Sequence, residues 1–136
     1  MPETRDEASG GTPRRSRILV VEDEYFVALD VEHRLKQAGY DVVGIADTAM
    51  HAIRIAEKER PDLAIMDIRL AGARDGTDVA IELRERLGIP SIFATAHGDE
   101  ATKRRAEQAR PLGWLQKPYS PEALIILVRK ALASLT

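Results

Sequence analysis

The sequence predicts an α/β fold, a doubly wound domain in which five parallel strands alternate with five helices. The main observation is the run Leu63–Asp67, which is apolar at consecutive rather than alternate positions until it ends on a carboxylate. Such a strand needs cover on both faces, as the strands of a buried parallel sheet do. Short apolar runs also alternate with helical patterns along the chain, and each strand, helix, strand step forces a parallel crossover.

Length and composition limit the class of protein. The 136 residues and 44% hydrophobic content suit one domain with a single core, and the absence of cysteine excludes disulfides and thiolate chemistry. The longest apolar run, Ala123–Val128, is too short to span a bilayer, and no signal peptide is recognisable. We therefore expect a cytoplasmic protein without a membrane partner. A net charge of -2 and 4% aromatic residues argue against nucleic-acid binding.

The apolar runs place the five strands, and the residues around them place the helix ends. The predicted strands are Ile18–Val21, Val42–Ala46, Leu63–Asp67, Ser91–Thr95 and Trp114–Lys117. Gly39 and Gly88 should end the first and third helices, and Pro61 closes the second. Residues 1–16 have no apolar periodicity, so a disordered N-terminal tail is predicted before a domain that spans residues 17–136.

Polar residues mark the starts of the later helices. Asp75 is suited to cap the third helix, and Ser120 to cap the last. Gly98 or Asp99 should open the fourth helix, which is predicted to reach about Ala109.

Polar side chains also stand at the carboxyl ends of four predicted strands. They are Glu22 and Asp23 after the first strand, Asp67 on the third, Thr95 on the fourth and Lys117 on the fifth. Ligands of open parallel sheets bind at this edge, so we expect these side chains to lie close together. Three carboxylates that meet repel one another unless they are protonated or share a cation. Oxygen ligands without a nearby histidine or cysteine favour a hard divalent ion, here Mg²⁺.

Asp67 is the candidate for covalent chemistry. A carboxylate can accept a phosphoryl group, with the transition state stabilised by the metal, the Lys117 cation and the Thr95 hydroxyl. Each residue alone is a weak signal, because an acid at a strand end is more often a helix cap and a lysine before proline is usually a surface residue. Their conjunction at four strand ends favours a phosphoacceptor site.

These residues resemble the receiver domain of two-component response regulators, from about Arg17 to Leu135. The matching segments are Leu19–Glu24, Met66–Ile68, Asp75–Gly76, Ala94–Ala96 and Lys117–Tyr119. The resemblance implies a flavodoxin-like (βα)5 fold with strand order 2-1-3-4-5. It also implies a cis peptide bond between Lys117 and Pro118.

The resemblance further implies a role for each matching residue. The roles are metal binding for Glu22, Asp23, Asp67 and the Arg69 backbone carbonyl, phosphoryl acceptance for Asp67, and phosphoryl contact for Thr95 and Lys117. Trp114 stands where the family has a switch aromatic residue, usually Tyr or Phe. Glu22 stands where Asp is commoner in the family.

The expected function is that of a single-domain response regulator rather than an enzyme, because no residues follow the last predicted helix. Such a protein takes its phosphoryl group from a histidine kinase or a histidine phosphotransfer protein. It would signal by docking to an unknown downstream protein or by passing the phosphoryl group on.

Three other classes share parts of this pattern. Enzymes of the haloacid dehalogenase type have a second Asp two positions after the nucleophile, where this chain has Arg69. A flavin or dinucleotide binder is disfavoured because no G-x-G-x-x-G follows the first strand. A pseudo-receiver, which keeps the fold but is never phosphorylated, stays open, although the complete acid set argues against it.

Two partner surfaces are predicted. Phe26 and Leu29 lie off the main apolar stripe of the first helix, close to the acid pair. Because the receivers that this chain resembles dock histidine kinases or phosphotransfer proteins through this helix, the resemblance implies that these two residues are candidate contacts. Ile126, with Ile125, is a candidate for a homodimer through the last helix. Singly exposed apolar residues are common, so ordinary surface or edge packing remains the alternative for both pairs.

Overall fold

One five-stranded parallel sheet forms the centre of the protein. The computed structural model describes residues 6–7, 9–10, 14–70, 75–96 and 100–136. The strands of the sheet are β3 (Arg17–Val21), β4 (Asp41–Ala46), β5 (Leu63–Asp67), β6 (Ser91–Thr95) and β7 (Gly113–Gln116). Their spatial order is β4-β3-β5-β6-β7, and all neighbouring pairs are parallel. Counted along the chain from β3, this is the predicted order 2-1-3-4-5.

The strand boundaries differ from the predicted ones by single residues. The first two strands begin one residue earlier, because Arg17 and Asp41 extend the ladder between β3 and β4. The last strand is Gly113–Gln116 rather than Trp114–Lys117, so the prediction was wrong in placing Lys117 inside it. The N–H of Lys117 still donates to the Thr95 carbonyl at 2.8 Å, which holds the residue at the end of the strand.

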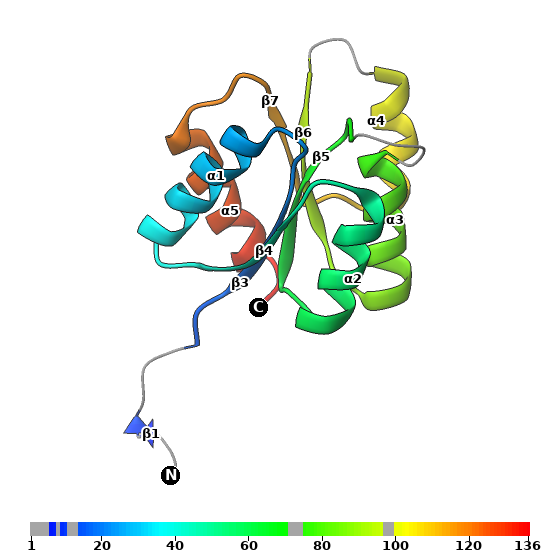
Figure 1. Ribbon diagram of the computed structural model, residues 1–136. Coiled ribbons are helices and arrows are strands. Elements are labelled where there is room, and N and C mark those ends of the chain that lie inside the picture. The colour runs from blue at the N-terminus through cyan, green and yellow to red at the C-terminus, as the bar shows by residue number, and fades with distance from the viewer. Residues whose placement is uncertain (1–5, 8, 11–13, 71–74, 97–99) are drawn as a thin grey trace.

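The helices cover both faces of the sheet. They are α1 (Tyr25–Gln37), α2 (Ala49–Glu59), α3 (Gly76–Leu87), α4 (Glu100–Ala106) and α5 (Pro121–Ala133). Helices α1 and α5 lie on one face, and α2, α3 and α4 on the other (Figure 1). A 3₁₀ turn, Glu107–Ala109, completes the predicted fourth helix, whose predicted start at Gly98 or Asp99 lies outside the described residues.

The caps and the central strand explain why these elements form. The side chains of Asp75 and Ser120 accept the N–H groups of Asp78 and Ala123, both at 3.0 Å, which confirms the two predicted helix caps. All five residues of β5 are buried. Its side chains pack alternately against the α2 and α3 layer and against the α1 and α5 layer, as the unbroken apolar run predicts.

The predicted tail lies partly outside the description, since residues 1–5, 8 and 11–13 are not described. Within its described part, β1 (Asp6–Glu7) and β2 (Ser9–Gly10) pair with each other. The division into a tail, residues 1–16, and a domain, residues 17–136, stays a prediction. No helix in the described portion of the chain is both long and apolar enough to cross a membrane.

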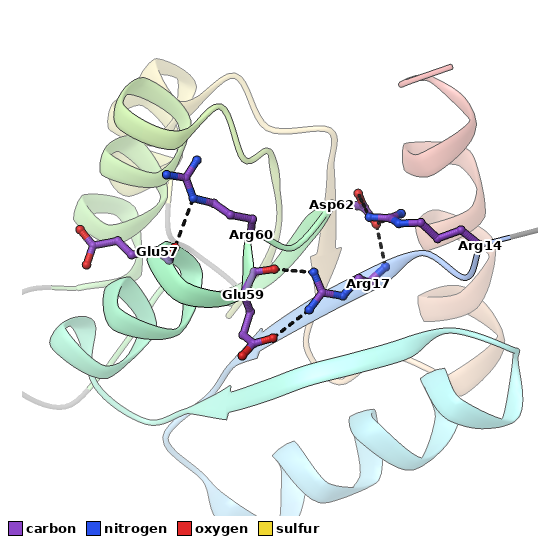
Figure 2. Close-up of polar contacts among 6 residues, drawn as sticks. All are labelled: Arg14, Arg17, Glu57, Glu59, Arg60 and Asp62. Carbon is purple, nitrogen blue, oxygen red and sulfur yellow. Dashed lines mark hydrogen bonds and ion pairs between the residues drawn. The ribbon is translucent and has the colours of Figure 1, made fainter.

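Asp62 ties the start of β3 to the start of β5 (Figure 2). Its Oδ2 accepts the backbone N–H of Arg17 at 2.8 Å, and both of its carboxylate oxygens accept from the Arg14 guanidinium, at 3.2 and 3.3 Å. The Arg17 guanidinium donates to Glu59 Oε1 at 2.8 Å and to the Glu59 carbonyl. Burial acts to raise the pKa of Asp62, but the bonds from Arg14 and Arg17 outweigh it and hold the pKa below its usual value.

The N-terminus of α3 lies directly against the end of β5. The N–H of Gly76 donates to the Ile68 carbonyl at 2.7 Å. A Cβ atom added at Gly76 would stand 1.9 Å from the carbonyl oxygen of Asp67 and 3.0 Å from the Cα of Ile68. The obstacles are backbone atoms, so no side-chain rotation can relieve the overlap. Glycine is therefore required where α3 meets the segment that carries Asp67.

Replacing Asp62 with Asn should lower the free energy of unfolding by about 1 to 2 kcal/mol near neutral pH, because a charged acceptor loses its charge. The pKa of Asp62 is lower in the folded than in the unfolded chain. Its stabilising contribution is therefore present above the unfolded pKa, about 3.9, and is lost as the pH falls through the folded pKa. Denaturant titrations near pH 7 and near pH 2.5 measure the difference.

The matched control is Asp41→Asn, whose carboxylate lies farther from its cation, 3.8 Å from Arg15, and should change stability less. An Asp62→Asn deficit of the same size at both pH values would contradict the assigned role of the charge.

Replacing Gly76 with Ala should lower the free energy of unfolding by about 3 kcal/mol or more, because the methyl group overlaps fixed backbone. Gly44→Ala is the matched control: its new Cβ would lie 3.0 Å from Ile55 Cδ1, the movable end of a side chain, so the loss should be about 1 kcal/mol or less. Denaturant unfolding of both variants tests this. Equal losses would show that the contact with the Asp67 carbonyl is not limiting.

Candidate functional site

Three carboxylates meet at the carboxyl edge of the sheet. Glu22 and Asp23 follow β3, and Asp67 ends β5. Each offers a carboxylate oxygen, and these oxygens lie within 4.8 Å of one another. Glu22 and Asp67 are buried, with 5% and 7% of their surface exposed, whereas Asp23 is exposed to solvent. The structure thus brings the three predicted acids together, with one of them open to solvent.

Lys117 joins two of these acids. Its Nζ lies 3.2 Å from Asp67 Oδ2 and 3.4 Å from Glu22 Oε1. Burial alone would lower the pKa of Lys117, but the charges of Asp67 and Glu22 outweigh it, so its pKa lies above the ordinary value. The predicted cis peptide bond between Lys117 and Pro118 is confirmed. Lys117 therefore stands as a cation in contact with the predicted phosphoacceptor.

Glu22 is a buried acid among other charged groups. Its pKa is raised to about 7, mainly by burial and further by the nearby Asp67 carboxylate, whereas the Glu24 N–H that donates to its Oε2 at 3.0 Å and the charge of Lys117 act to lower it. A divalent cation bound at this cluster would stabilise the charged form of Glu22. Carboxylate oxygens from Glu22, Asp23 and Asp67 are the donors that Mg²⁺ prefers, so these residues fit the predicted metal.

The Asp67 carboxylate is held from two sides. Its Oδ1 accepts the backbone N–H of Arg69 at 3.1 Å, and its Oδ2 faces Lys117. A cavity of about 270 Å³ opens beside it, lined by Asp23, Glu24, Asp67, Ile68, Arg69, Ala96 and Lys117. This space suits an ion with its waters and a phosphoryl group. The predicted ligation by the Arg69 carbonyl stays a prediction.

Thr95 lies at the end of β6, next to Ala94, the register partner of Asp67. The residue is buried, and its hydroxyl donates to the Ala96 carbonyl at 3.1 Å. Ala96, the next residue, lines the cavity. Thr95 is thus close to the acid cluster along the sheet edge, and its predicted contact with a phosphoryl group stays a prediction.

Trp114 is half-buried in β7, where it stacks on Phe93 of β6 with 5.0 Å between the ring centroids. The Nζ of Lys103, in α4, lies 5.4 Å from the centre of the Trp114 ring. The indole is therefore packed between the sheet and α4. Its predicted role as a switch stays a prediction.

The two predicted partner surfaces border α1 and α5. Phe26 is 82% exposed and lines a groove of about 630 Å³ together with Lys117 and Tyr119, whereas Leu29 is half-buried. Ile126 is 59% exposed and Ile125 is half-buried. Both isoleucines line a separate hollow of about 370 Å³ between α1 and α5.

Sequence reasoning assigned no role to two aromatic residues near the site, although one of them, Tyr119, belongs to the matching segment Lys117–Tyr119. Tyr25 is exposed and makes an edge contact with Phe26, with 5.6 Å between the ring centroids. Tyr119 lines the groove beside Lys117. Both could have been found by their position, because each lies within two residues of a matched motif residue, Asp23 or Lys117.

The sequence of this chain is similar to a known protein family and to proteins of known identity. A family model described as the response regulator receiver domain matches residues 18–129. The transcriptional regulatory protein PdtaR of Mycobacterium tuberculosis is 34% identical over 127 residues, which cover 93% of this chain and 60% of that protein. The phyllosphere-induced regulator PhyR of Methylorubrum extorquens is 33% identical over 118 residues, covering 86% of this chain and 43% of PhyR. The chain thus spans roughly half the length of these relatives.

Two solved structures with the same fold are described as receiver domains. The signal receiver domain of a modulated diguanylate cyclase from Desulfovibrio desulfuricans superposes with a TM-score of 0.83 at 36% identity, covering 89% of this chain and 96% of that one. A CheY-like response regulator receiver domain protein from Methanospirillum hungatei gives a TM-score of 0.82 at 25% identity, with the same coverage of 89% and 96%. With this fold and the family match over most of its length, the chain belongs to the response regulator receiver domain family of two-component signalling.

Proposed function

We propose that this receiver domain accepts a phosphoryl group on Asp67 from a histidine kinase or a histidine phosphotransfer protein, in a reaction that needs Mg²⁺. The observation that carries the proposal is the contact of Asp67 Oδ2 with Lys117 Nζ at 3.2 Å, inside a cluster of three acids. In the transfer, an Asp67 oxygen bonds to phosphorus while the bond from phosphorus to the imidazole nitrogen of the donor breaks. The released nitrogen keeps the electron pair of that bond.

The surrounding residues support this chemistry. The Arg69 N–H orients Asp67 through its Oδ1, and Lys117 offsets negative charge as the phosphoryl group arrives. Glu22, Asp23 and Asp67 would hold the metal, together with the Arg69 carbonyl. When bound, Mg²⁺ would neutralise charge on the transferring group. Thr95 would then move to donate its hydroxyl to a phosphoryl oxygen. Trp114 would change position in response to the movement of Thr95.

The proposal assigns this chain a signalling role rather than enzymatic turnover. We propose a cytoplasmic regulator that docks to a downstream protein or passes its phosphoryl group on, without nucleic-acid or membrane partners. Arg69 supports the distinction from haloacid dehalogenases, because a guanidinium group cannot serve there as the second acid. The complete acid set with Lys117 in contact supports a phosphorylated receiver over a pseudo-receiver.

Phe26 and the groove beside it support α1 as the surface that meets the donor. The groove contains Lys117 in its wall, so a helix seated there would present a phosphohistidine near Asp67. Phe26 would be the exposed anchor, and Leu29, one turn further along α1, a flanking contact. The homodimer through Ile125 and Ile126 stays a weaker proposal that light scattering would decide.

Incubation with acetyl phosphate and Mg²⁺ should add a single phosphoryl group to the intact protein. Intact-protein mass spectrometry measures the adduct on the wild type and on Asp67→Asn, with Mg²⁺ and with excess chelator. We expect the adduct only for the wild type with metal, because the asparagine amide is a poor nucleophile and the chelator removes the cation. An adduct of equal yield on Asp67→Asn, or no adduct on a folded wild type, would contradict the proposal.

The docking surface predicts a difference between donors. Phe26→Ala and Leu29→Ala should slow transfer from a protein histidine donor by about fivefold or more, the effect expected of an interface anchor. Transfer from acetyl phosphate should not change, because that donor is too small to need the groove. Ile126→Ala, which truncates an exposed apolar residue of α5 that does not line this groove, is the control and should transfer normally with both donors. Normal transfer by the two α1 variants from the protein donor would exclude this surface.

A further inference from the structure

Two charged side chains of helix α4 contact neighbouring elements. Of the seven residues described in α4, Ala106 alone is buried. The last turn contains three cations, Lys103, Arg104 and Arg105. Two of them contact neighbouring elements: Lys103 lies over the Trp114 ring of β7, and Arg105 reaches α3. With so little apolar packing, these two contacts contribute to the position of α4.

Arg105 binds the N-terminal cap of α3. Its guanidinium pairs with Asp78 Oδ1 and lies 3.5 Å from Asp75 Oδ2. These two acids form a capping box: Asp75 Oδ1 accepts the Asp78 N–H at 3.0 Å, and Asp78 Oδ2 accepts the Asp75 N–H at 3.4 Å. A cation that holds both members of the box is therefore attached to the backbone at the start of α3, rather than to loose side chains.

The start of α3 is in turn fixed to the segment that carries Asp67. Gly76, directly after Asp75, donates its N–H to the Ile68 carbonyl, and its Cα approaches the Asp67 carbonyl too closely for any side chain. Densely packed backbone of this kind transmits displacement rather than absorbing it. A shift of the peptide after Asp67 therefore moves the N-terminus of α3, and with it the carboxylates that hold Arg105.

We propose that Arg105 is a positioning residue that couples the placement of α4 to the backbone around Asp67, through Asp75 and Asp78. The inference rests on the proposed phosphorylation of Asp67. Because coupling between two sites is reciprocal, the position of α4 also influences the affinity of the Asp67 site for a phosphoryl analogue such as beryllofluoride. The proposal makes Arg105 the link between the phosphoryl site and α4, although its side chain does not touch the acid cluster.

The chain contains its own reporter for the position of α4. Trp114 is the only tryptophan in the sequence, and the Lys103 ammonium lies 5.4 Å from its ring centre. Lys103 and Arg105 belong to the same short helix, so a displacement of α4 changes the charge next to the indole. Tryptophan fluorescence therefore reports on α4, while the mass of the protein reports independently on Asp67.

The experiment compares the fluorescence change on adding beryllofluoride with Mg²⁺ in the wild type and in three variants of the full chain. Arg105→Gln should lose at least half of the wild-type change, because α4 is no longer connected to the α3 cap. Arg105→Lys, which keeps the charge, should retain most of it. Arg104→Gln removes a neighbouring exposed cation that has no ion pair among the described residues, and should behave as the wild type. The acetyl phosphate adduct is measured by mass in parallel.

The outcomes separate this inference from the proposed function. Suppose that every protein forms the acetyl phosphate adduct. If Arg105→Gln then keeps the wild-type fluorescence change, or if Arg104→Gln loses as much of that change as Arg105→Gln does, the role of Arg105 is overturned and phosphorylation of Asp67 is not. No adduct on the wild type would overturn both. If Arg105→Gln does not fold, Asp78→Asn replaces it, since the amide oxygen can still accept the Asp75 N–H but the charge is lost. That variant should show the same loss, and a full response would contradict the inference.

Discussion

The charge balance between Lys117 and the buried carboxylates of Glu22 and Asp67 is the constraint on which the site depends. Glu22 and Lys117 are 95 positions apart in the sequence, yet their charged atoms lie 3.4 Å from each other. Only a parallel sheet with helical crossovers delivers the ends of β3, β5 and β7 to one edge in this way. Burial of these charges without a partner would cost several kcal/mol, so the fold and the site support each other.

The same balance gives the proposed ligands, a divalent cation and a phosphoryl group, a direct effect on the site. Burial is the main cause that raises the pKa of Glu22 to about 7, and the Asp67 carboxylate raises it further, so a nearby cation would stabilise the charged form of Glu22. A cation relieves the repulsion, and a phosphoryl group then adds negative charge and acceptor oxygens next to Lys117 and near Thr95. Any change in charge at this edge therefore acts electrostatically on residues from several strands. The buried sheet allows few local rearrangements that would compensate for such a change.

The proposed coupling between the backbone around Asp67 and the position of α4 depends on close packing and on ion pairs. Gly76 allows the start of α3 to touch the peptide after Asp67, and the cap acids Asp75 and Asp78 bind Arg105 of α4. Helix α4 has one buried residue, so its placement is determined by a small number of contacts at its surface. A receiver domain in which a weakly packed helix is tied to the segment that carries the proposed phosphoacceptor has a physical means of presenting two surfaces to a partner.

The sequence by itself determined the strands, because an unbroken apolar run such as Leu63–Met66 has one plausible environment, a sheet covered on both faces. It also determined the identity of the acid cluster, since strand ends of a parallel sheet converge whatever the details of packing. The exact end of β7, the stacking of Trp114 and the binding of Arg105 to the α3 cap were decided only by the tertiary structure. Each depends on contacts between residues about 20 to 30 positions apart, which no local pattern encodes: an arginine on a short helix looks like a solvated cation until its neighbour is placed beside it.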